Sequence, residues 1–449
     1  MPTTTRMLHF GTDGIRGHAD DELSDESVRA LGRATARVLG CDRLFLLARD
    51  TRESGARIEA ALAAGLADEG GEVESVGVFP TPGLAYLSQT RGLPAAMISA
   101  SHNPFHDNGI KVFAPGGRKL ADAVEADIER EMGGLPPSPG GAKPSLVPSD
   151  ADREGYLEHL VGALEGRTLD GVRVVIDCAN GAAFEVAPQV FTRLGADVEV
   201  RCADPDGRNI NAGCGSTHPE GLQRAVVASG AHAGLAFDGD ADRLIAVDEK
   251  GALLDGDHFL AIAAADLRSR NRLRGDAVVT TVMANLGFRK AMDAEGIAVV
   301  ETRVGDRYVL EEMDAGDYAL GGEQSGHVIF ADLATTGDGI LSGLVLLDAM
   351  RRAQRPLSEM AAMVQKLPQV LRNVEVVDRA RLDAATGFWD EVAAVEAEMG
   401  SGGRVLVRPS GTEPLVRVMV EAPTHDEAER HAGRLISALV AALGSPSPA

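Results

Sequence analysis

The segment 98-ISASHNPFHDNGIKVF-113 joins a short apolar run to a dense group of hydrogen-bonding side chains. The run at 95–98 is typical of a buried strand. The ten positions after it hold Ser99, Ser101, His102, Asn103, His106, Asp107 and Asn108. Gly109 then interrupts the chain, and Lys111 stands between two apolar residues. Because open α/β sheets bind ligands beyond the carboxyl ends of their strands, we expect this loop to carry chemistry.

Patterns typical of strands and helices alternate on both sides of this loop. A strand pattern at 43–50, an amphipathic helix at 54–70 and a strand at 72–80 precede it. The stretch 133–149 is rich in Gly, Pro and Ser, as linkers are, and the alternation resumes after it in two further rounds. Such alternation indicates parallel sheets sandwiched between helices. From about residue 368 the pattern changes to that of a small α+β domain.

The sequence therefore predicts the α/β fold class, with three similar α/β sandwich domains and a smaller C-terminal α+β domain. A length of 449 residues is consistent with several domains of roughly 150 residues each. We place the domain boundaries at 1–150, 151–254, 255–366 and 367–449, with the serine-rich loop in the first domain.

Composition excludes several classes of protein. The net charge of -23 and the lack of a dominant basic patch argue against nucleic acid as a partner. The four cysteines, at positions 41, 178, 202 and 214, are far apart and lack the spacing of a zinc site or a disulfide scaffold. The N-terminus has no apolar signal region, and no window approaches the length of a membrane span. We expect a cytoplasmic protein with reduced thiols and no membrane partner.

A second polar loop, 238-DGDADR-243, follows the apolar run GLAF. Asp238, Asp240 and Asp242 alternate with small residues and offer a compact set of oxygen ligands, which hard cations such as Mg²⁺ prefer. With Glu249 at the twelfth position, the spacing also nearly matches an EF-hand calcium loop. Arg243 stands where that loop needs glycine, and the flanks are strand-like. A solvated turn without a cation is the third interpretation, although three adjacent carboxylates repel one another.

Two more loops have weaker signals when taken alone. In 321-GGEQSGH-327, Glu323, Ser325 and His327 alternate, so in an extended segment they face one side and suit the hydroxyl groups of a sugar. In 408-RPSGTEP-414, backbone N–H groups and hydroxyls lie beside Arg408, with Arg417 nearby, which favours a phosphate cradle. An ordinary hairpin with polar turn residues explains either loop as well.

Five short motifs in one order give the chain a specific resemblance. FGTDGIRG (10–17), SASHNP (99–104), DGDADR (238–243), GEQSGH (322–327) and RPSGTEP (408–414) follow one another as in the α-D-phosphohexomutase superfamily. The chain resembles that family over nearly its whole length, and the resemblance implies four domains around one central cleft. FGTDGIRG, VGDRY (304–308) and Gln324 resemble the branch of the family that acts on glucosamine phosphates.

The resemblance also implies roles for individual residues. The catalytic residues would be Ser101 as a phosphoserine, with Arg16, Lys111 and His102. The metal ligands would be Ser101, Asp238, Asp240 and Asp242, holding one Mg²⁺ per subunit. The substrate would contact Arg243, Asp306, Arg307, Glu323, Ser325 and His327. Its distal phosphate would be held by Arg408, Ser410, Gly411, Thr412 and Arg417.

The implied reaction is the reversible interconversion of glucosamine 6-phosphate and glucosamine 1-phosphate. Ser101 would pass its phosphoryl group to the sugar, forming a 1,6-bisphosphate that turns over and returns the other group; glucosamine or glucose 1,6-bisphosphate would serve as intermediate and activator. Sugar phosphates are then the expected partners. Glucose or mannose phosphates as substrates, a serine-dependent phosphatase and a calcium-responsive binding module stay open at this point. So do Ser99 as nucleophile, the general acid and base, and the choice between a monomer and a homodimer.

Overall fold

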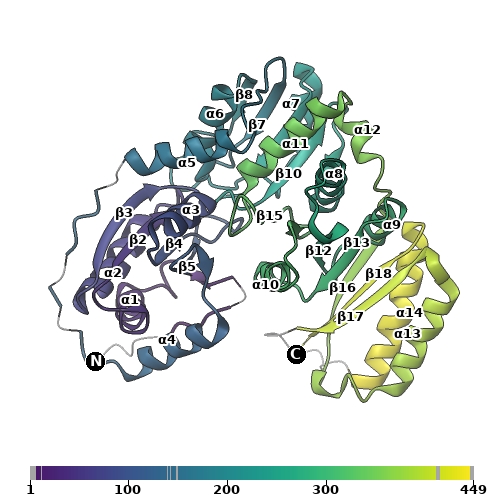
Figure 1. Ribbon diagram of the computed structural model, residues 1–449. Helices are drawn as coiled ribbons and strands as arrows, with labels where there is room; N and C mark the ends of the chain where they lie inside the picture. The colour runs from purple at the N-terminus through teal and green to yellow at the C-terminus, as the bar shows by residue number, and fades with distance from the viewer. Residues whose placement is uncertain are drawn as a thin grey trace. The chain divides into compact units, whose positions relative to one another are not determined.

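The computed structural model describes residues 7–11, 13–138, 140–141, 143–147, 150–410 and 415–444. The chain forms two compact units, one made of residues up to Met283 together with Glu295–Met363, and the other of Ala284–Ala294 together with Val364 onward. The larger unit contains three mixed sheets (Figure 1). In the part of the chain that the structure describes, no helix combines the length and the apolar character needed to cross a membrane.

The first sheet has a parallel centre and an antiparallel edge. Strands β3, β2 and β4 run parallel, whereas β5 is antiparallel to β4 and pairs in turn with β1 and β6. The strands are β1 (Ile15–His18), β2 (Leu44–Arg49), β3 (Glu72–Val78), β4 (Ala95–Ile98), β5 (Asp107–Ala114) and β6 (Arg118–Lys119). The helices are α1 (Asp25–Leu39), α2 (Gly55–Asp68), α3 (Thr81–Arg91) and α4 (Asp122–Gly134).

The second sheet repeats this arrangement. Strands β8, β7 and β9 are parallel, and β10 turns back antiparallel to β9 before pairing with β11. The strands are β7 (Arg173–Asp177), β8 (Asp197–Arg201), β9 (Ala233–Phe237), β10 (Leu244–Asp248) and β11 (Leu253–Leu254). The helices are α5 (Asp150–Gly162), α6 (Ala183–Arg193) and α7 (Glu220–Ser229).

The third sheet has the same order in a shorter form. Strands β13, β12 and β14 are parallel, and β15 is antiparallel to β14. The strands are β12 (Ala277–Thr281), β13 (Ala298–Thr302), β14 (Leu320–Gly322) and β15 (Val328–Phe330). The helices are α8 (Gly256–Ser269), the short 3₁₀ helix η1 (Arg274–Asp276), α10 (Asp306–Gly316), α11 (Gly339–Ala353) and α12 (Leu357–Ala361).

The repeated topology places three polar loops at equivalent positions. Each loop joins the last parallel strand of a sheet to its antiparallel neighbour: β4 to β5, β9 to β10, and β14 to β15. Strands β4, β9 and β14 are buried along their whole length, so burial on both faces fixes where each loop begins. The predicted fold class is thus confirmed for three α/β domains of like design.

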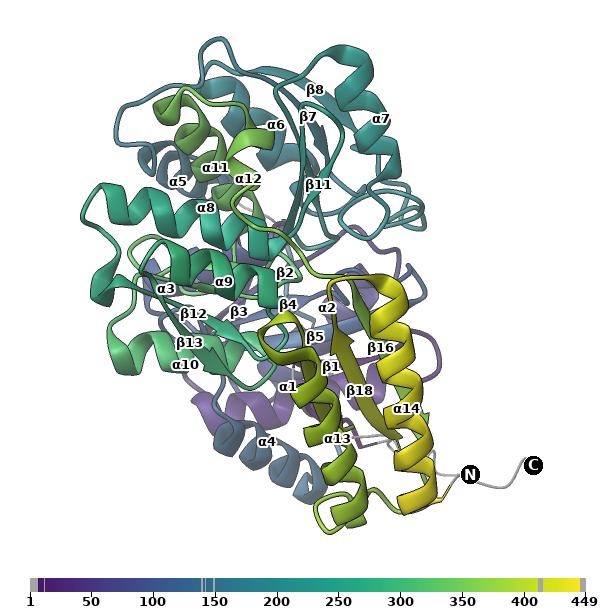
Figure 2. The ribbon, with the colours of Figure 1, turned by 90° about the vertical axis from the view of Figure 1, so that its right-hand side faces the viewer.

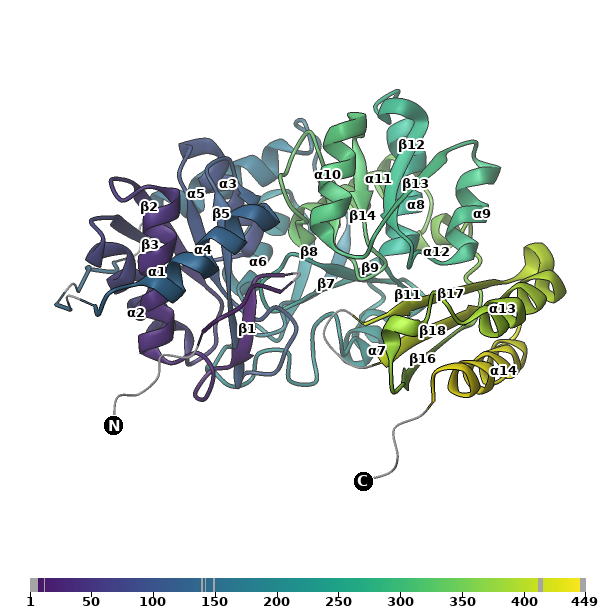
Figure 3. The same ribbon diagram turned by 90° about the horizontal axis from the view of Figure 1, so that it is seen from below.

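The smaller unit has a different architecture. Its three-stranded antiparallel sheet, in the order β16-β18-β17, has helices α13 and α14 on one face (Figures 2 and 3). The elements are α9 (Leu286–Ala294), β16 (Gln369–Glu375), η2 (Arg379–Arg381), α13 (Thr386–Met399), η3 (Gly400–Gly402), β17 (Arg404–Pro409), β18 (Leu415–Glu421) and α14 (His425–Leu443). This agrees with the predicted α+β C-terminal domain.

Candidate active site

Ser101 lies three residues beyond the end of β4 with an unusual backbone. Its φ of 53° is in the left-handed region, which costs a residue with a Cβ on the order of 1 kcal/mol. The side chain is fully buried, and its Oγ donates to Asp238 Oδ2 at 2.5 Å. His102 Nδ1 lies 3.2 Å from the same Oγ. Strain of this kind needs surrounding contacts to maintain it.

Two side chains from other segments hold the backbone of the serine loop. Arg52, fully buried, donates to the carbonyl oxygens of Ser101 and Asn103 at 2.9 Å each. Asn211 Nδ2 donates to the same two oxygens at 2.9 and 3.1 Å. The carboxylate of Asp50 fixes Arg52 through its Nε at 2.8 Å. The loop is therefore positioned by side-chain donors rather than by a sheet ladder.

Arg52 and Asn211 were not among the residues expected from the sequence. The available signal for Arg52 was its position directly after the strand predicted at 43–50, the same placement that singled out the other loops. Asn211 had no such signal, because it lies in a long irregular segment between β8 and α7.

Ser99 has a structural role in the same loop. Its hydroxyl donates to Asp50 Oδ2 at 2.6 Å and accepts the backbone N–H of Ser101 at 2.9 Å. The side chain is fully buried against these partners. Its oxygen is directed toward Asp50, whereas Ser101 Oγ is directed toward Asp238.

Asp238, Asp240 and Asp242 form a buried carboxylate triad. One oxygen of each lies within 4.8 Å of the others, and all three side chains are almost completely buried. Oδ1 of Asp240 and Oδ1 of Asp242 are buried and, among the described residues, meet no hydrogen-bond donor. Three hard oxygen donors of this kind fit a divalent cation such as Mg²⁺. Burial and the neighbouring carboxylates raise the pKa of Asp238 well above its usual value.

The EF-hand interpretation of this turn is wrong. The segment is flanked by strands β9 and β10 rather than by helices. Glu249, which would be the bidentate ligand, instead accepts the backbone N–H of Ser358 at 3.1 Å. Gly239 also leaves no room for a side chain, since a Cβ there would lie 2.4 Å from the Ser101 carbonyl oxygen.

Lys111 supplies a positive charge to this triad. Its Nζ donates to Asp240 Oδ2 at 2.8 Å and to Asp242 Oδ2 at 3.1 Å, and lies 3.5 Å from Asp13. Burial opposes the charge of this ammonium, but the three carboxylates outweigh it and raise its pKa well above the usual value. Lys111 is thus a cation throughout the neutral range.

The charge network continues from the triad into the third sheet. His327 Nδ1 lies 3.6 Å from Asp242 and its Nε2 lies 3.4 Å from Asp306. Asp306 accepts from Lys119 at 2.6 Å, and Lys119 also pairs with Asp13. Burial opposes protonation of His327, yet Asp242 and Asp306 outweigh it and raise its pKa. Lys119 and Asp13, which the sequence did not single out, therefore connect His327 with Lys111.

The other predicted catalytic and sugar-binding residues differ in their contacts and in their exposure. His102 Nδ1 also lies 3.3 Å from Arg243, and burial together with Arg243 and Arg16 lowers the pKa of His102 to about 4. Arg16 pairs with Asp13. Glu323 accepts the N–H of Gly305 at 3.1 Å, and Ser325 is exposed.

Arg307, which was expected to contact the substrate, makes ion pairs within the protein. Its guanidinium pairs with Glu125 at 2.7 Å and with Asp122, both on α4. Burial raises the pKa of Glu125 to about 7. Arg307 thus joins α10 to α4, and its neighbour Asp306 is the one that takes part in the charge network.

The predicted phosphate loop is described only in part. Arg408 and Arg417 face each other as register partners on β17 and β18. Ser410 is buried, its N–H donates to the Leu415 carbonyl at 2.9 Å, and its own carbonyl accepts from Arg379. Gly411 and Thr412 lie outside the described residues.

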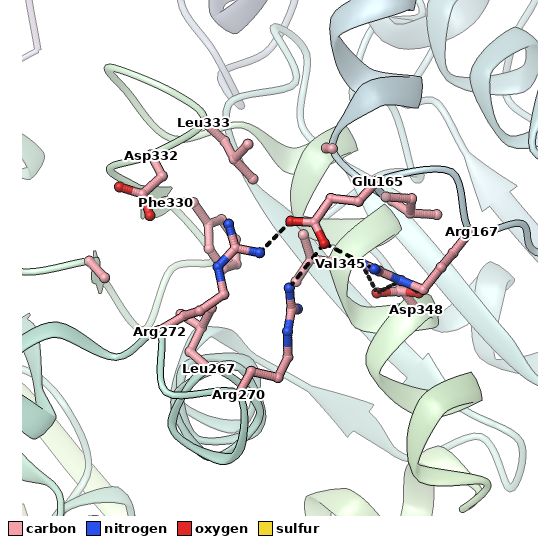
Figure 4. A pocket seen from close by; sticks show the side chains of 13 residues that line it. Glu165, Arg167, Leu267, Arg270, Arg272, Phe330, Asp332, Leu333, Val345 and Asp348 are labelled. Carbon is pink, nitrogen blue, oxygen red and sulfur yellow. Dashed lines mark hydrogen bonds and ion pairs between the residues drawn. The ribbon is translucent and has the colours of Figure 1, made fainter.

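A pocket elsewhere in the larger unit has a structural character (Figure 4). Glu165, in the turn that follows α5, points toward Arg270 and Arg272, and it accepts from Arg167 at 3.0 Å. Arg167 also pairs with Asp348 of α11 at 2.9 Å. Because carboxylates of the protein already partner these three arginines, the pocket joins the ends of α5 and α8 to α11 and does not resemble a catalytic centre.

Comparison with known proteins gives the class. Four families, described as phosphoglucomutase/phosphomannomutase alpha/beta/alpha domains I, II and III and C-terminal domain, match residues 7–135, 154–251, 255–367 and 371–438. A phosphoglucomutase/phosphomannomutase family protein from Burkholderia thailandensis has a TM-score of 0.80 at 25% identity, covering 98% of both chains. The fold and the site define an enzyme of the phosphohexomutase class.

Two relatives narrow this class. The phosphoglucosamine mutase of Desulforudis audaxviator is 53% identical over 421 residues, covering 92% of this chain and 93% of the relative. That of Streptomyces avermitilis is 51% identical over 449 residues, covering 97% and 99%. The chain belongs to the phosphoglucosamine mutase family.

A more distant solved structure shares the fold. The N-acetylphosphoglucosamine mutase of Aspergillus fumigatus, in complex with GlcNAc-6P and magnesium, has a TM-score of 0.70 at 20% identity. The match covers 97% of this chain and 96% of that protein.

Replacing Arg52 with lysine tests how the serine loop is held. Lysine keeps the charge but lacks the planar fork that reaches several carbonyls at once. We expect kcat for mutase turnover to fall about tenfold or more, equivalent to roughly 1.4 kcal/mol. Thermal unfolding should also shift, since a buried carbonyl without its donor costs about 1–3 kcal/mol.

Arg57→Lys is the matched control for this change. Arg57 also bonds backbone carbonyls, those of Ala19 and Leu23 at 2.6 and 3.0 Å, but it does not contact the serine loop. It should lower stability with kcat nearly unchanged. Equal losses of kcat in the two variants would show that Arg52 acts only through general stability.

Proposed function

We propose that the protein interconverts glucosamine 6-phosphate and glucosamine 1-phosphate through a phosphoserine at position 101. The observation that carries this proposal is the left-handed Ser101, whose Oγ lies 2.5 Å from the carboxylate triad. A nucleophile held next to a cation site is the arrangement that phosphoryl transfer requires, because the reaction depends on alignment and charge neutralisation. The names of the relatives at about half identity support the choice of substrate.

The reaction would proceed in two transfers. In the first, the bond from Ser101 Oγ to phosphorus breaks while the free sugar hydroxyl bonds to phosphorus and loses its proton. The product is glucosamine 1,6-bisphosphate, with glucose 1,6-bisphosphate as the related activator. After the bisphosphate has reoriented in the site, Ser101 Oγ takes the other phosphoryl group. The sugar oxygen that is released regains a proton.

The charged side chains near Ser101 would stabilise the transferred group. Lys111, a permanent ammonium, offsets negative charge that develops between the serine and the sugar. Arg243 and Arg16 lie close enough to His102 to lower its pKa, and their guanidinium groups suit phosphoryl oxygens. With Ser101 unphosphorylated, the pKa of about 4 keeps His102 neutral at pH 7.

A magnesium ion is proposed at the carboxylate triad. Asp238, Asp240 and Asp242 would hold the ion together with the oxygen on Ser101. The two buried carboxylate oxygens that, among the described residues, accept no hydrogen bond are available as ligands. When bound, Mg²⁺ would neutralise the phosphoryl oxygens.

The sugar and its distal phosphate would be bound by the remaining loops. We assign the sugar hydroxyls to Glu323, Ser325 and His327, with Asp306 as a further substrate contact. The N–H of Gly337 donates to His327 Nε2 at 2.9 Å and orients its ring. Arg307 stays a predicted substrate contact. Its ion pairs with α4 do not support that role. The distal phosphate is assigned to Arg408, Ser410, Gly411, Thr412 and Arg417.

The proposal extends to organisation and location. We retain the boundaries 1–150, 151–254, 255–366 and 367–449 for the four domains. A cytoplasmic location, where thiols stay reduced, accords with this function, and a homodimer stays a prediction.

Ser101→Ala should abolish turnover and labelling by a phosphoryl donor while the fold persists. Its counterpart Ser99→Ala removes the hydroxyl that fixes Asp50 and should lower stability and kcat but still allow labelling at position 101. Labelling is followed by mass spectrometry of the peptides, and free phosphate is measured in parallel. A label on Ser99, or phosphate release that matches substrate consumption, would contradict the proposed mutase mechanism.

Removal of the metal should stop turnover, and added Mg²⁺ should restore it. Asp240→Asn removes one of the three negative charges and should raise the Mg²⁺ concentration for half-maximal activity by about tenfold or more, as expected for a loss of roughly 1.4 kcal/mol in binding. Glu249→Gln is the control, since Glu249 partners Ser358 instead. If Glu249→Gln weakened the metal response as much as Asp240→Asn, the triad would not be the metal site.

Substrate preference is tested with glucosamine 1-phosphate and glucose 1-phosphate under the same 1,6-bisphosphate activator. The sugar amine is cationic near neutral pH, and Glu323 is the nearest acidic candidate in the sugar loop. A carboxylate also accepts from neutral hydroxyls, so the preference rests mainly on the family. We expect kcat/KM to be at least about tenfold higher for glucosamine 1-phosphate, a difference of roughly 1.4 kcal/mol. Equal or reversed values would assign the chain to a phosphoglucomutase or phosphomannomutase activity.

A further inference from the structure

A second cluster of reactive side chains lies at the ends of strands of the second sheet and has no part in the proposed reaction. Cys202 Sγ, Cys214 Sγ and a carboxylate oxygen of Asp177 all lie within 4.8 Å of one another. Cys214 and Asp177 are buried, whereas Cys202 is partly exposed. The cluster joins the end of β7, the residue after β8 and the irregular segment that precedes α7.

The partners of Asp177 argue against a metal site at this cluster. Its Oδ1 accepts the backbone N–H of Ala179 at 2.9 Å, and the carboxylate also accepts from the N–H of Gly215. The oxygens are therefore engaged in fixing two turns of the backbone. Two sulfur atoms remain as the reactive groups, fewer than the four ligands of a structural zinc site.

The two thiols have the asymmetry of a redox pair. Sensor cysteines are solvent-accessible, favour the thiolate and stand next to a second cysteine. Cys202 is the accessible member, and its hydrogen bond with Cys214 lowers its pKa. The same hydrogen bond and burial raise the pKa of Cys214. Cys178 is fully buried, and burial raises its pKa as well.

The segment that carries Cys214 also holds the catalytic loop. Asn211, three residues earlier, donates to the carbonyls of Ser101 and Asn103. Its own N–H donates to the carbonyl of Ala179 at 2.9 Å. On the other side of Cys214, the N–H of Ser216 donates at 2.9 Å to Phe237, the residue before Asp238. A displacement of Cys214 would thus shift contacts to both the serine loop and the turn that begins at Asp238.

Cys202 is tied to the same segment. Its carbonyl accepts the N–H of Asn180 at 2.6 Å, and Asn180 Nδ2 lies 3.9 Å from Cys214 Sγ. A disulfide requires the two sulfur atoms to approach to about 2 Å. Closing the remaining gap requires one sulfur to move toward the other, and we expect the segment that carries it to shift with it.

We propose that Cys202 and Cys214 form a disulfide on exposure to hydrogen peroxide, and that this bond loosens the hold of Asn211 on the Ser101 loop. The Cys202 thiolate attacks one peroxide oxygen, the O–O bond breaks, and a sulfenic acid and one water form once the protons are returned. The sulfur of Cys214 then attacks Cys202 sulfur and displaces the hydroxyl, which leaves as a second water with the thiol proton. Both sulfurs are oxidised, peroxide is reduced, and a dithiol reductant reverses the change by exchange.

The experiment uses the full chain with Cys41→Ser, which removes the exposed thiol remote from the cluster. Reduced protein is treated with hydrogen peroxide, alkylated and digested with trypsin. Cleavage after Arg201, Arg208 and Arg224 places Cys202 and Cys214 in separate peptides, 202–208 and 209–224. The expected product is these two peptides joined by a reducible bond, with Cys178 recovered as a free thiol in a third peptide.

Hydrogen exchange and turnover measure the consequence of the bond. Peptides that contain Ser101 should exchange faster in the oxidised protein, and mutase activity should fall at least about fivefold, as for the loss of roughly one hydrogen bond to the loop. A dithiol reductant should restore both. Cys202→Ser should resist inactivation, and Cys214→Ser should stop at a trappable sulfenic acid on Cys202 with activity largely kept.

The inference would be overturned by the absence of the cross-linked peptides, by a bond that includes Cys178 instead, or by a bond that leaves exchange at Ser101 unchanged. Zinc retained by the purified chain and lost in both serine variants would assign the cluster to a metal. The activity effect alone rests on the proposed function; a reduced enzyme without mutase turnover would refute that function but leave the peptide and exchange results valid.

Discussion

Repulsion among three buried carboxylates is the constraint on which the rest of the site depends. Asp238, Asp240 and Asp242 occupy one turn, where burial and mutual repulsion both oppose their ionisation. Lys111 offsets part of this charge from the neighbouring sheet, and His327 approaches it from the third. The pKa of Asp238 is raised by burial and by the other two carboxylates, whereas Lys111 and His327 outweigh burial at Asp242 and lower its pKa. Much of the polar network around Ser101 can be understood as a response to this charge.

The repeated sheet topology explains how three separate stretches of chain converge on this charge. Each of the three hairpins begins at the end of a buried parallel strand, and burial allows that strand little freedom to shift. Lys111 comes from β5, the aspartates from the turn between β9 and β10, and His327 from the turn between β14 and β15. The same device, used three times, places groups from distant parts of the sequence within a few ångströms of one another. Local loop sequence then decides only which chemical group each hairpin presents.

Much of this arrangement could be predicted from the sequence, for reasons that the structure makes clear. Strand periodicity and the polar residues that follow each strand are local signals, so the fold class and the aspartate turn could be inferred without coordinates. Asn211 and Lys119 could not, because each acts on residues far away in the sequence and carries no local mark of its partner. Arg52 had a local signal in its position after a strand, but no signal that pointed to its partners. Arg307 was expected to contact the substrate because of its position after a strand, and the structure adds an ion pair with Glu125 on α4 that the sequence does not reveal. Long-range pairing of charges is what the sequence leaves undetermined.

The left-handed backbone of Ser101 has a consequence for how the protein couples its parts. A serine in a strained backbone conformation keeps its position only while its surroundings favour that conformation over the relaxed one. Here the carbonyl oxygens of the loop receive one donor, Arg52, from the first α/β domain and another, Asn211, from the second. The position of the hydroxyl therefore depends on both domains at once, although the serine belongs to only one of them. A change in the second domain at the segment of Asn211 would act on the serine through these carbonyls, whereas a change at Asp238 would act on its hydroxyl directly.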